Sequence, residues 1–380
     1  MSRPNRWLMR ARVALLGVGI GIAAFPLIES EQSLVNSDWP AFAVGGRLAF
    51  SGDPDLLYNR PAQVRVQAGI ARGVRLNPDD QGGLLPFDQP PWIALLSAPF
   101  AAIGNNLGAR LWILVELVAL AVGLAVLARG GQRRWPALAA FASVPAALMA
   151  LNAQIDGLVV LGLGAAFVLW RSDRRFVAGC ALGLCLAKPH LVVGLALVLL
   201  VAREWRVVAG WALSAAGLLA AVALRDPRWP LQWLNFLSSR AGHIGSELSL
   251  VGAALHLPIG RAPAMGAAIA VLMVVVAGAV LLARTRRDVP NEALAVVIGA
   301  SLLAAPHALE SDLVLGAAAL ALAGGFGWLE WAVLSAAALV VAVTHDSPWS
   351  TFVGIALIGG LTLRIGLTHR PPALAAPVEA

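Results

Sequence analysis

Residues 108–128 read GARLWILVELVALAVGLAVLA, and this apolar run decides the class of fold. An α-helix needs about 20 apolar residues to cross the hydrocarbon core of a bilayer, and this run is long enough. Backbone polar groups in lipid must be satisfied within the helix, so repeated runs predict an all-α polytopic membrane protein. Further runs lie on both sides of it, at about 11–28, 92–106, 136–150, 155–170, 175–187, 189–202, 206–224, 264–283, 291–304, 311–325, 327–344 and 350–367.

The composition excludes the other classes of protein. Of the 380 residues, 59% are hydrophobic and 13% are charged, about half the charged share of a soluble domain. A soluble fold of this size cannot bury so much apolar surface, which excludes a water-soluble enzyme. The apolar chain also excludes disorder. Cys180 and Cys185 are the two cysteines and lie in one apolar segment, which excludes a disulfide scaffold.

The net charge of +7 indicates membrane topology and no nucleic-acid partner. Loops on the cytoplasmic side are enriched in Lys and Arg. All the arginine clusters face that side if the segment 92–106 does not cross, so we predict an interfacial or re-entrant helix there. About twelve spans and two cytoplasmic termini follow, with 11–28 retained as a signal anchor. The clusters are Arg3/Arg6/Arg10/Arg12, Arg129/Arg133/Arg134, Arg171/Arg174/Arg175, Arg203/Arg206, Arg284/Arg286/Arg287 and Arg364/Arg370.

The same topology defines the expected domain organisation. A single integral membrane domain is expected over 1–370, followed by a short cytoplasmic tail at 371–380. The domain contains two long outer loops, at 29–107 and 225–263.

The first outer loop is predicted to carry two short interfacial helices, at 39–50 and 61–74. In the second of them, Val64, Val66 and Ile70 alternate with arginines. This pattern suits a helix that lies on the membrane surface.

Acidic residues and histidines gather in the segments assigned to the outer side. These segments hold 14 of the 21 acids, and five of the six histidines lie in or near them. Acids contribute little to the orientation of membrane proteins, so the clustering needs another cause. We interpret it as an external active site.

Asp38 is the first candidate for that site, in the stretch Ser37-Asp38-Trp39-Pro40. An Asp before Trp-Pro is a good helix N-cap, so capping accounts for it as well as catalysis does. One carboxylate cannot do both at the same moment.

Two further polar breaks lie between apolar runs. Gln154 and Asp156 form one, and either loop polarity or hydrogen bonding to a sugar explains them. Lys188, the only lysine, forms the other together with Pro189 and His190. A lysine at mid-membrane costs about 2.5–3.5 kcal/mol on insertion scales. Lys188 is therefore either a snorkelling side chain at a helix end or a cation that binds a phosphate.

The last strong break is Pro306-His307-Ala308-Leu309-Glu310-Ser311-Asp312. Three titratable groups within six residues at a membrane boundary are unusual. Helix capping in a solvated loop explains His307, Glu310 and Asp312, and so does a place in the active site.

The order and spacing of these features resemble glycosyltransferase family 87, over roughly residues 12–325. Members of that family are polytopic enzymes of the GT-C type, which use polyprenyl-phosphate sugars, typically polyprenol-phosphate mannose. The resemblance implies a GT-C-like bundle and a catalytic base at Asp38, the acid of the first outer loop. It is carried by Asp38-Trp39, Ala41-Phe42-Ala43-Val44, Gly52-Asp53-Pro54-Asp55-Leu56-Leu57-Tyr58, Pro90-Pro91, Gln154, the small-residue segment from Ala178-Gly179 to Lys188-Pro189, and Pro306-His307 with Asp312.

The chain departs from the family pattern at four places. The usual aromatic after the Asp is Trp39, followed by Pro40, and the aromatic-Pro-Pro stretch reads Phe87-Asp88-Gln89-Pro90-Pro91. Ala153-Gln154 replaces the usual Gly-Gln, and Lys188-Pro189-His190 replaces Lys-Pro-Gln. These departures leave the general chemistry in place and the sugar and acceptor open.

The resemblance implies transfer of a sugar, mannose above all, from a polyprenyl-phosphate donor to an envelope lipid or glycan. The reaction is expected to invert the anomeric centre at the outer face of the plasma (inner) membrane. One phosphate has little charge to neutralise, so neither a metal ion nor another cofactor is expected. The expected roles are general base for Asp38, donor-phosphate binding for Lys188, His190 and His307, and sugar or acceptor binding for Trp39, Gln154, Asp156, Glu310 and Asp312.

Two other functions remain open on the sequence. A transporter or flippase of a lipid-linked or polar substrate would show broken helices at the midplane and an internal repeat, and we detect no such repeat. A scaffold subunit of an envelope-assembly complex is the third possibility. It would tolerate changes at Asp38 and Lys188, which an enzyme would not.

Overall fold

The computed structural model describes residues 6–71, 84–128, 135–240, 248–256, 259–285, 291–323, 327–344 and 348–368. Within those ranges the chain forms helices joined by short connections, and none of these residues is in a strand. The predicted all-α class is confirmed. The expected tail at 371–380 and the arginine cluster at 129–134 lie outside the described residues.

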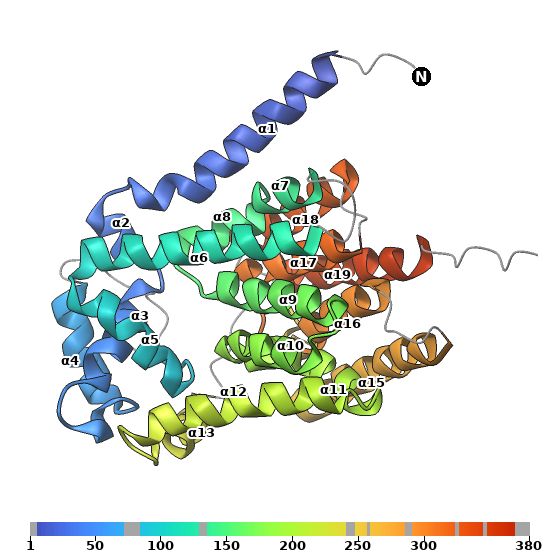
Figure 1. Cartoon of the computed structure of the whole chain (residues 1–380). Helices are drawn as coiled ribbons and strands as arrows, with labels where there is room; N and C mark the ends of the chain where they lie inside the picture. Colours follow the sequence, from blue (N-terminus) through green and yellow to red (C-terminus); the bar gives the residue numbers. More distant parts are fainter. Residues whose placement is uncertain are drawn as a thin grey trace, which may run out of the picture.

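Four helices of the described ranges are long and apolar enough to cross a membrane. They are α1 (Arg6–Ala24), α6 (Asn105–Ala128), α12 (Trp205–Ala223) and α15 (Arg261–Thr285). α6 packs against α9, and α15 packs against α16, which in turn contacts α19. These helices form the bundle of a polytopic membrane protein, from which α1 leans away (Figure 1). The shorter members are α9 (Asp156–Arg171), α16 (Asn291–Ala304), α18 (Trp328–Val343) and α19 (Pro348–Thr368).

Four of the predicted spans are each built from two helical pieces. Pro145 stands in the first turn of α8, the second piece of one span, and Pro189 begins η4, the first piece of another, because proline fits the first turn of a helix and not its interior. Such breaks are tolerated at membrane depth where the freed backbone groups are buried in protein. The pairs are α7 (Trp135–Phe141) with α8 (Val144–Leu151), α10 (Arg175–Ala181) with η3 (Leu182–Ala187), η4 (Pro189–Val192) with α11 (Val193–Val201), and η5 (Glu310–Leu313) with α17 (Val314–Leu322).

Short helices gather at one end of the bundle, at the left of Figure 1, and we call this region the cap. The two helices predicted at 39–50 and 61–74 are present there as α3 and α4. The cap consists of α2 (Glu31–Val35), α3 (Trp39–Ala49), α4 (Arg60–Ile70), α5 (Pro91–Ala102) and α13 (Trp229–Arg240). The remaining short elements are η1 (Phe25–Leu27), η2 (Pro54–Leu56) and α14 (Leu250–Leu255).

Helix α5 covers most of the segment predicted not to cross the membrane. It has 12 residues, which gives it a length of about 18 Å. The hydrocarbon core is about 30 Å thick. The helix is therefore too short to span it without help from its flanks.

Helix α4 buries polar as well as apolar side chains. Gln63 and Gln67 have exposed fractions of 0% and 3% and are buried together with Ala62 and Ile70, whereas Val64 is exposed. The reason is that each glutamine binds the backbone of a neighbouring extended segment, residues 84–90, which we call the strap. A polar side chain can be buried when its hydrogen bonds are satisfied, and these are.

Close contact between α6 and α9 depends on glycine. A Cβ atom at Gly123 would lie 2.6 Å from the carbonyl oxygen of Val160, and one at Gly157 would lie 2.1 Å from that of Glu116. Small residues let membrane helices approach at backbone distance. This contact fixes the start of α9, which carries one of the predicted site residues.

Candidate active site at the cap

Asp38 immediately precedes α3, and its side chain does not cap that helix. The side-chain contact at this helix start comes from the preceding Ser37: its Oγ accepts from the Trp39 amide at 3.2 Å and donates to the Leu34 carbonyl at 2.6 Å. The alternative interpretation of Asp38 as a capping residue is thereby contradicted. Its carboxylate is left available for another partner.

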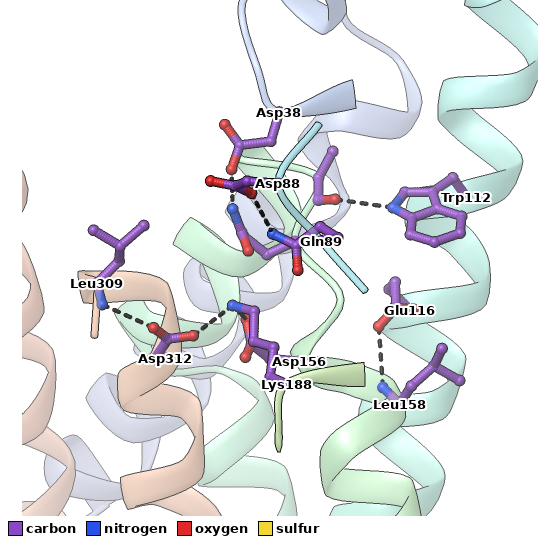
Figure 2. A network of polar contacts seen from close by, with 12 residues as sticks. Asp38, Asp88, Gln89, Trp112, Glu116, Asp156, Leu158, Lys188, Leu309 and Asp312 are labelled. Atoms are coloured by element: carbon purple, nitrogen blue, oxygen red, sulfur yellow. Dashed lines mark hydrogen bonds and ion pairs between the residues drawn. The ribbon is translucent and has the colours of Figure 1, made fainter. Parts of the chain in front are cut away.

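That partner is Gln154, predicted from the sequence as a sugar or acceptor ligand. Its Nε2 donates a hydrogen bond to Oδ2 of Asp38 (Figure 2). The Asp38 amide also donates to the carbonyl of Asn152 at 3.2 Å. Asp38 is therefore tied to the turn before α9 through both its backbone and its side chain.

The environment raises the pKa of Asp38 to about 7. Burial is the largest cause, since it disfavours the charged form. The nearby positive charge of Lys188 acts against it, Asp88 and Glu310 raise the pKa further, and His307 lowers it. A carboxylate with a pKa near 7 is well matched to accept a proton at neutral pH.

Lys188 lies in a buried ionic triad. Its Nζ is 3.0 Å from Oδ2 of Asp156 and 2.5 Å from Oδ1 of Asp312, as Figure 2 shows. The exposed fractions of the three side chains are 5%, 0% and 1%. The other oxygen of Asp312 accepts from the Leu309 amide at 2.8 Å. The two aspartates, predicted as sugar or acceptor ligands, are thus engaged by Lys188, which has three donors and uses two of them here.

The two predicted histidines lie near each other, with ring centroids 6.3 Å apart. His190 has a buried Nε2 without a hydrogen-bond partner among the described residues, and His307 is exposed. Glu310 is half-buried and close enough to Asp38 to affect its pKa. The structure therefore brings Asp38, Gln154, the triad and the acids and histidines around them into one region.

Trp39 does not belong to the open part of this region. Its side chain is fully buried, and its ring packs against Trp112 with centroids 6.4 Å apart. Trp39 lies on the side of α3 that faces the protein core. Its ring therefore has no exposed face for the stacking on a sugar that the sequence predicted.

Sequence reasoning missed Asp88, whose carboxylate lies beside that of Asp38 in Figure 2. Gln89 donates to its Oδ1 at 3.2 Å. Asp88 sits on the strap, and Gln63 and Gln67 hold the strap through its backbone: the Phe87 amide donates to Gln63 at 3.0 Å and the Leu85 amide to Gln67 at 2.8 Å. The sequence offered one signal, an acid inserted before Pro90-Pro91, and we interpreted it only as a departure from the family pattern.

Glu116 was missed as well. It lies halfway along α6 with an exposed fraction of 1%, and its Oε2 accepts from the Leu158 amide at 3.0 Å. The available signal was a single acid inside the apolar run that decides the fold. Among the described residues, no three His, Cys, Asp or Glu side chains lie where they could hold a metal ion, and the absence of a metal stays a prediction.

The fold and this region together define a membrane-embedded protein with acids, histidines and a buried lysine gathered at the cap end of its bundle. The model of glycosyltransferase family 87 matches residues 87–306. That range is more than half of the chain, so the protein belongs to glycosyltransferase family 87 and is a membrane glycosyltransferase. No curated protein and no solved structure matches the chain.

Proposed function

We propose that the protein transfers a mannosyl residue from a polyprenyl-phosphate donor to a hydroxyl group of an envelope lipid or glycan. The acceptor oxygen attacks the anomeric carbon while the bond from that carbon to the phosphate oxygen breaks. Polyprenyl phosphate leaves as an anion, and the acceptor proton passes to Asp38. A single displacement of this kind inverts the anomeric centre.

One observation carries the proposal. In a member of a glycosyltransferase family, Asp38 is a carboxylate that does not cap a helix and has a pKa of about 7. General-base catalysis needs a group that is ionised at the working pH and still basic enough to take a proton. Gln154 supports this role, because its amide fixes the carboxylate through Oδ2 and leaves Oδ1 for the acceptor.

The leaving phosphate needs positive charge and hydrogen-bond donors around it. Lys188 has one donor beyond the two that its aspartates use, and His190 and His307 lie together near it. With both aspartates ionised, the triad has a net charge of −1. We therefore assign Lys188 a single hydrogen bond to the phosphate and give the histidines a larger share than the sequence suggested. We assign the binding of acceptor hydroxyl groups to Glu310 and Asp88, which lie near enough to Asp38 to affect its pKa.

The arginine distribution supports a site on the outer face of the plasma membrane with both termini inside. A donor carried on polyprenyl phosphate reaches such a site from within the bilayer. The apolar surface of the surrounding helices suits this route.

The proposal is tested with purified protein in liposomes that contain bacterial membrane lipids and polyprenyl-phosphate [3H]mannose. Label should pass from the donor to a product, and Asp38→Asn should slow the transfer by about 10²–10⁴-fold, the usual contribution of a general base. Asp53→Asn is the matched control, since Asp53 lies in the same cap and its carboxylate only accepts from the Asp55 amide at 3.0 Å.

Asp53→Asn should transfer at the wild-type rate. Full activity of a correctly inserted Asp38→Asn protein would overturn the mechanism. Transfer from polyprenyl-phosphate glucose in preference to the mannose donor would overturn the assignment of the sugar while leaving the base in place.

A further inference from the structure

Glu116 is a buried carboxylate that the proposed reaction does not use. It lies halfway along α6 and is 1% exposed. Acidic side chains within membrane helices cost energy and are rare there, which makes a buried one a candidate for a functional role. It is on α6, away from the cap loops that carry Asp38.

Glu116 caps a helix that is not its own. Helix α9 begins at Asp156, and the residue before it, Ile155, provides no capping side chain. Oε2 of Glu116 accepts from the Leu158 amide at 3.0 Å, in the first turn of α9. The first amides of a helix have no partner within the helix, and a carboxyl oxygen of Glu116 satisfies one of them here.

The neighbouring glycine makes this approach possible. A Cβ atom at Gly157 would lie 2.1 Å from the carbonyl oxygen of Glu116 and 2.8 Å from its Oε2. The glycine therefore lets the start of α9 approach α6 closely enough for the carboxyl group to reach its amide.

One turn earlier, α6 holds the same segment at a second point. Trp112 donates from Nε1 to the carbonyl of Ala153 at 2.9 Å. Ala153 has a φ of 52°, a left-handed conformation that L residues other than glycine adopt at a cost. Trp112 and Glu116 thus fasten residues 153–158 at both ends, as Figure 2 shows for their two hydrogen bonds.

The two predicted site residues of this segment lie between these fastenings. Gln154 binds Asp38, and Asp156 binds Lys188. We propose that Glu116 is a positioning residue, which orients the 153–158 segment and through it both the base and the ionic triad. The inference rests on the proposed function in one respect, that Asp38 is the group whose titration governs the rate.

The test is the pH dependence of kcat. Gln154 donates to the ionised form of Asp38, so displacing it raises the pKa of Asp38. Glu116→Leu should therefore shift the acid limb of the kcat profile to higher pH by about one unit, the lower end of what the loss of a hydrogen bond to a charged group gives. Glu116→Gln keeps an oxygen that can accept from Leu158 and should restore most of the wild-type profile. The charged or titratable groups that face Asp38 are Lys188, Asp88, Glu310 and His307.

Glu330 provides a matched control. It is also a buried carboxylate that accepts from a backbone amide at the start of a helix, that of Gly327 at 2.9 Å, and it pairs with Arg364 at 2.7 Å. Glu330→Leu should reduce the folded yield as Glu116→Leu does, but the folded fraction should keep the wild-type pH profile. A Glu116→Leu profile that also stays in place would overturn the inference and leave only a structural role.

Two further measurements keep the inference testable. Trp112→Phe removes the hydrogen bond to Ala153 while keeping an aromatic ring. It should shift the kcat profile in the same direction, and it serves as the test if Glu116→Leu does not fold.

The carboxyl stretching band of Asp38, obtained as the difference between wild-type and Asp38→Asn infrared spectra, can be titrated without any sugar donor. It should move to higher pH in Glu116→Leu, and an unmoved band overturns the inference. Inactivity of the wild-type protein would overturn the proposed function alone.

Discussion

The aspartate at the cap and the aspartates of the buried triad have the same side chain and opposite surroundings. Asp38 has a neutral amide as its hydrogen-bond partner, and its pKa is about 7. Asp156 and Asp312 share the only lysine of the chain at 3.0 and 2.5 Å. The first arrangement leaves a group that can exchange a proton. The second holds the start of α9, the junction between η3 and η4, and η5 in a fixed relation.

In the proposed function, proton transfer falls to Asp38, whereas Asp156 and Asp312 hold the helices around Lys188 together. Lys188 is the only lysine in the sequence, but two of its three hydrogen-bond donors are already used by Asp156 and Asp312. A buried charge is retained when its partners satisfy it, and removing one partner leaves the others uncompensated.

The largest expected effect comes from breaking the triad. Lys188→Met leaves two buried carboxylates without a cation, and we expect a loss of about 3–5 kcal/mol in the free energy of unfolding. The measurement is thermal unfolding in detergent or nanodiscs. The control is Asp173→Asn, which removes the charge of an exposed carboxylate that pairs with Arg175 at 3.2 Å and should leave the melting temperature close to that of wild type. Equal stability of Lys188→Met and wild type would contradict the structural role of the triad.

The next largest effect is expected at the partner of the base. Gln154→Leu removes the donor that stabilises ionised Asp38, so the pKa of Asp38 should rise above about 7. Because the base must be ionised to accept a proton, the acid limb of kcat moves to higher pH, by about one unit for a hydrogen bond to a charged group. Gln232→Leu, which removes a hydrogen bond to Asp55 elsewhere in the cap, serves as the control. A limb that stays in place would show that Gln154 does not act on Asp38.

The smallest effect is expected at the strap. Asp88→Asn removes a negative charge that raises the pKa of Asp38, so the acid limb should move to lower pH, opposite to the shift in Gln154→Leu. Charges that are partly solvated are screened by salt, so the shift should shrink between 20 and 500 mM NaCl. A shift in the same direction as that of Gln154→Leu would contradict the arrangement of the two carboxylates.

Most of the helices could be predicted from the sequence, because apolar runs and the proline and charge breaks between them are local signals. The predicted helices at 39–50 and 61–74 correspond closely to α3 and α4. The division of four spans into two pieces was less visible, since a 3-10 turn that continues an apolar helix leaves the hydropathy unchanged.

The candidate site could be predicted only as a set of residues. The sequence places Asp38, Gln154 and Lys188 at helix breaks, but which carboxylate pairs with which group depends on contacts between segments more than 100 residues apart, such as Asp38 with Gln154 and Lys188 with Asp312. The contact of Ser37 with the start of α3 was invisible for a related reason. Two adjacent residues could each cap the helix, and only the backbone conformation decides between them.

The glutamines that hold the strap give a loop the hydrogen-bond pattern of a sheet. Gln63 and Gln67 each accept from one strap amide and donate to the carbonyl of the same residue, Phe87 in one case and Leu85 in the other. The two side chains thus act as a neighbouring strand would, at alternate residues of an extended chain. Deuterium should enter these amides only when several bonds open together, so the segment that carries Asp88 exchanges slowly and as a unit.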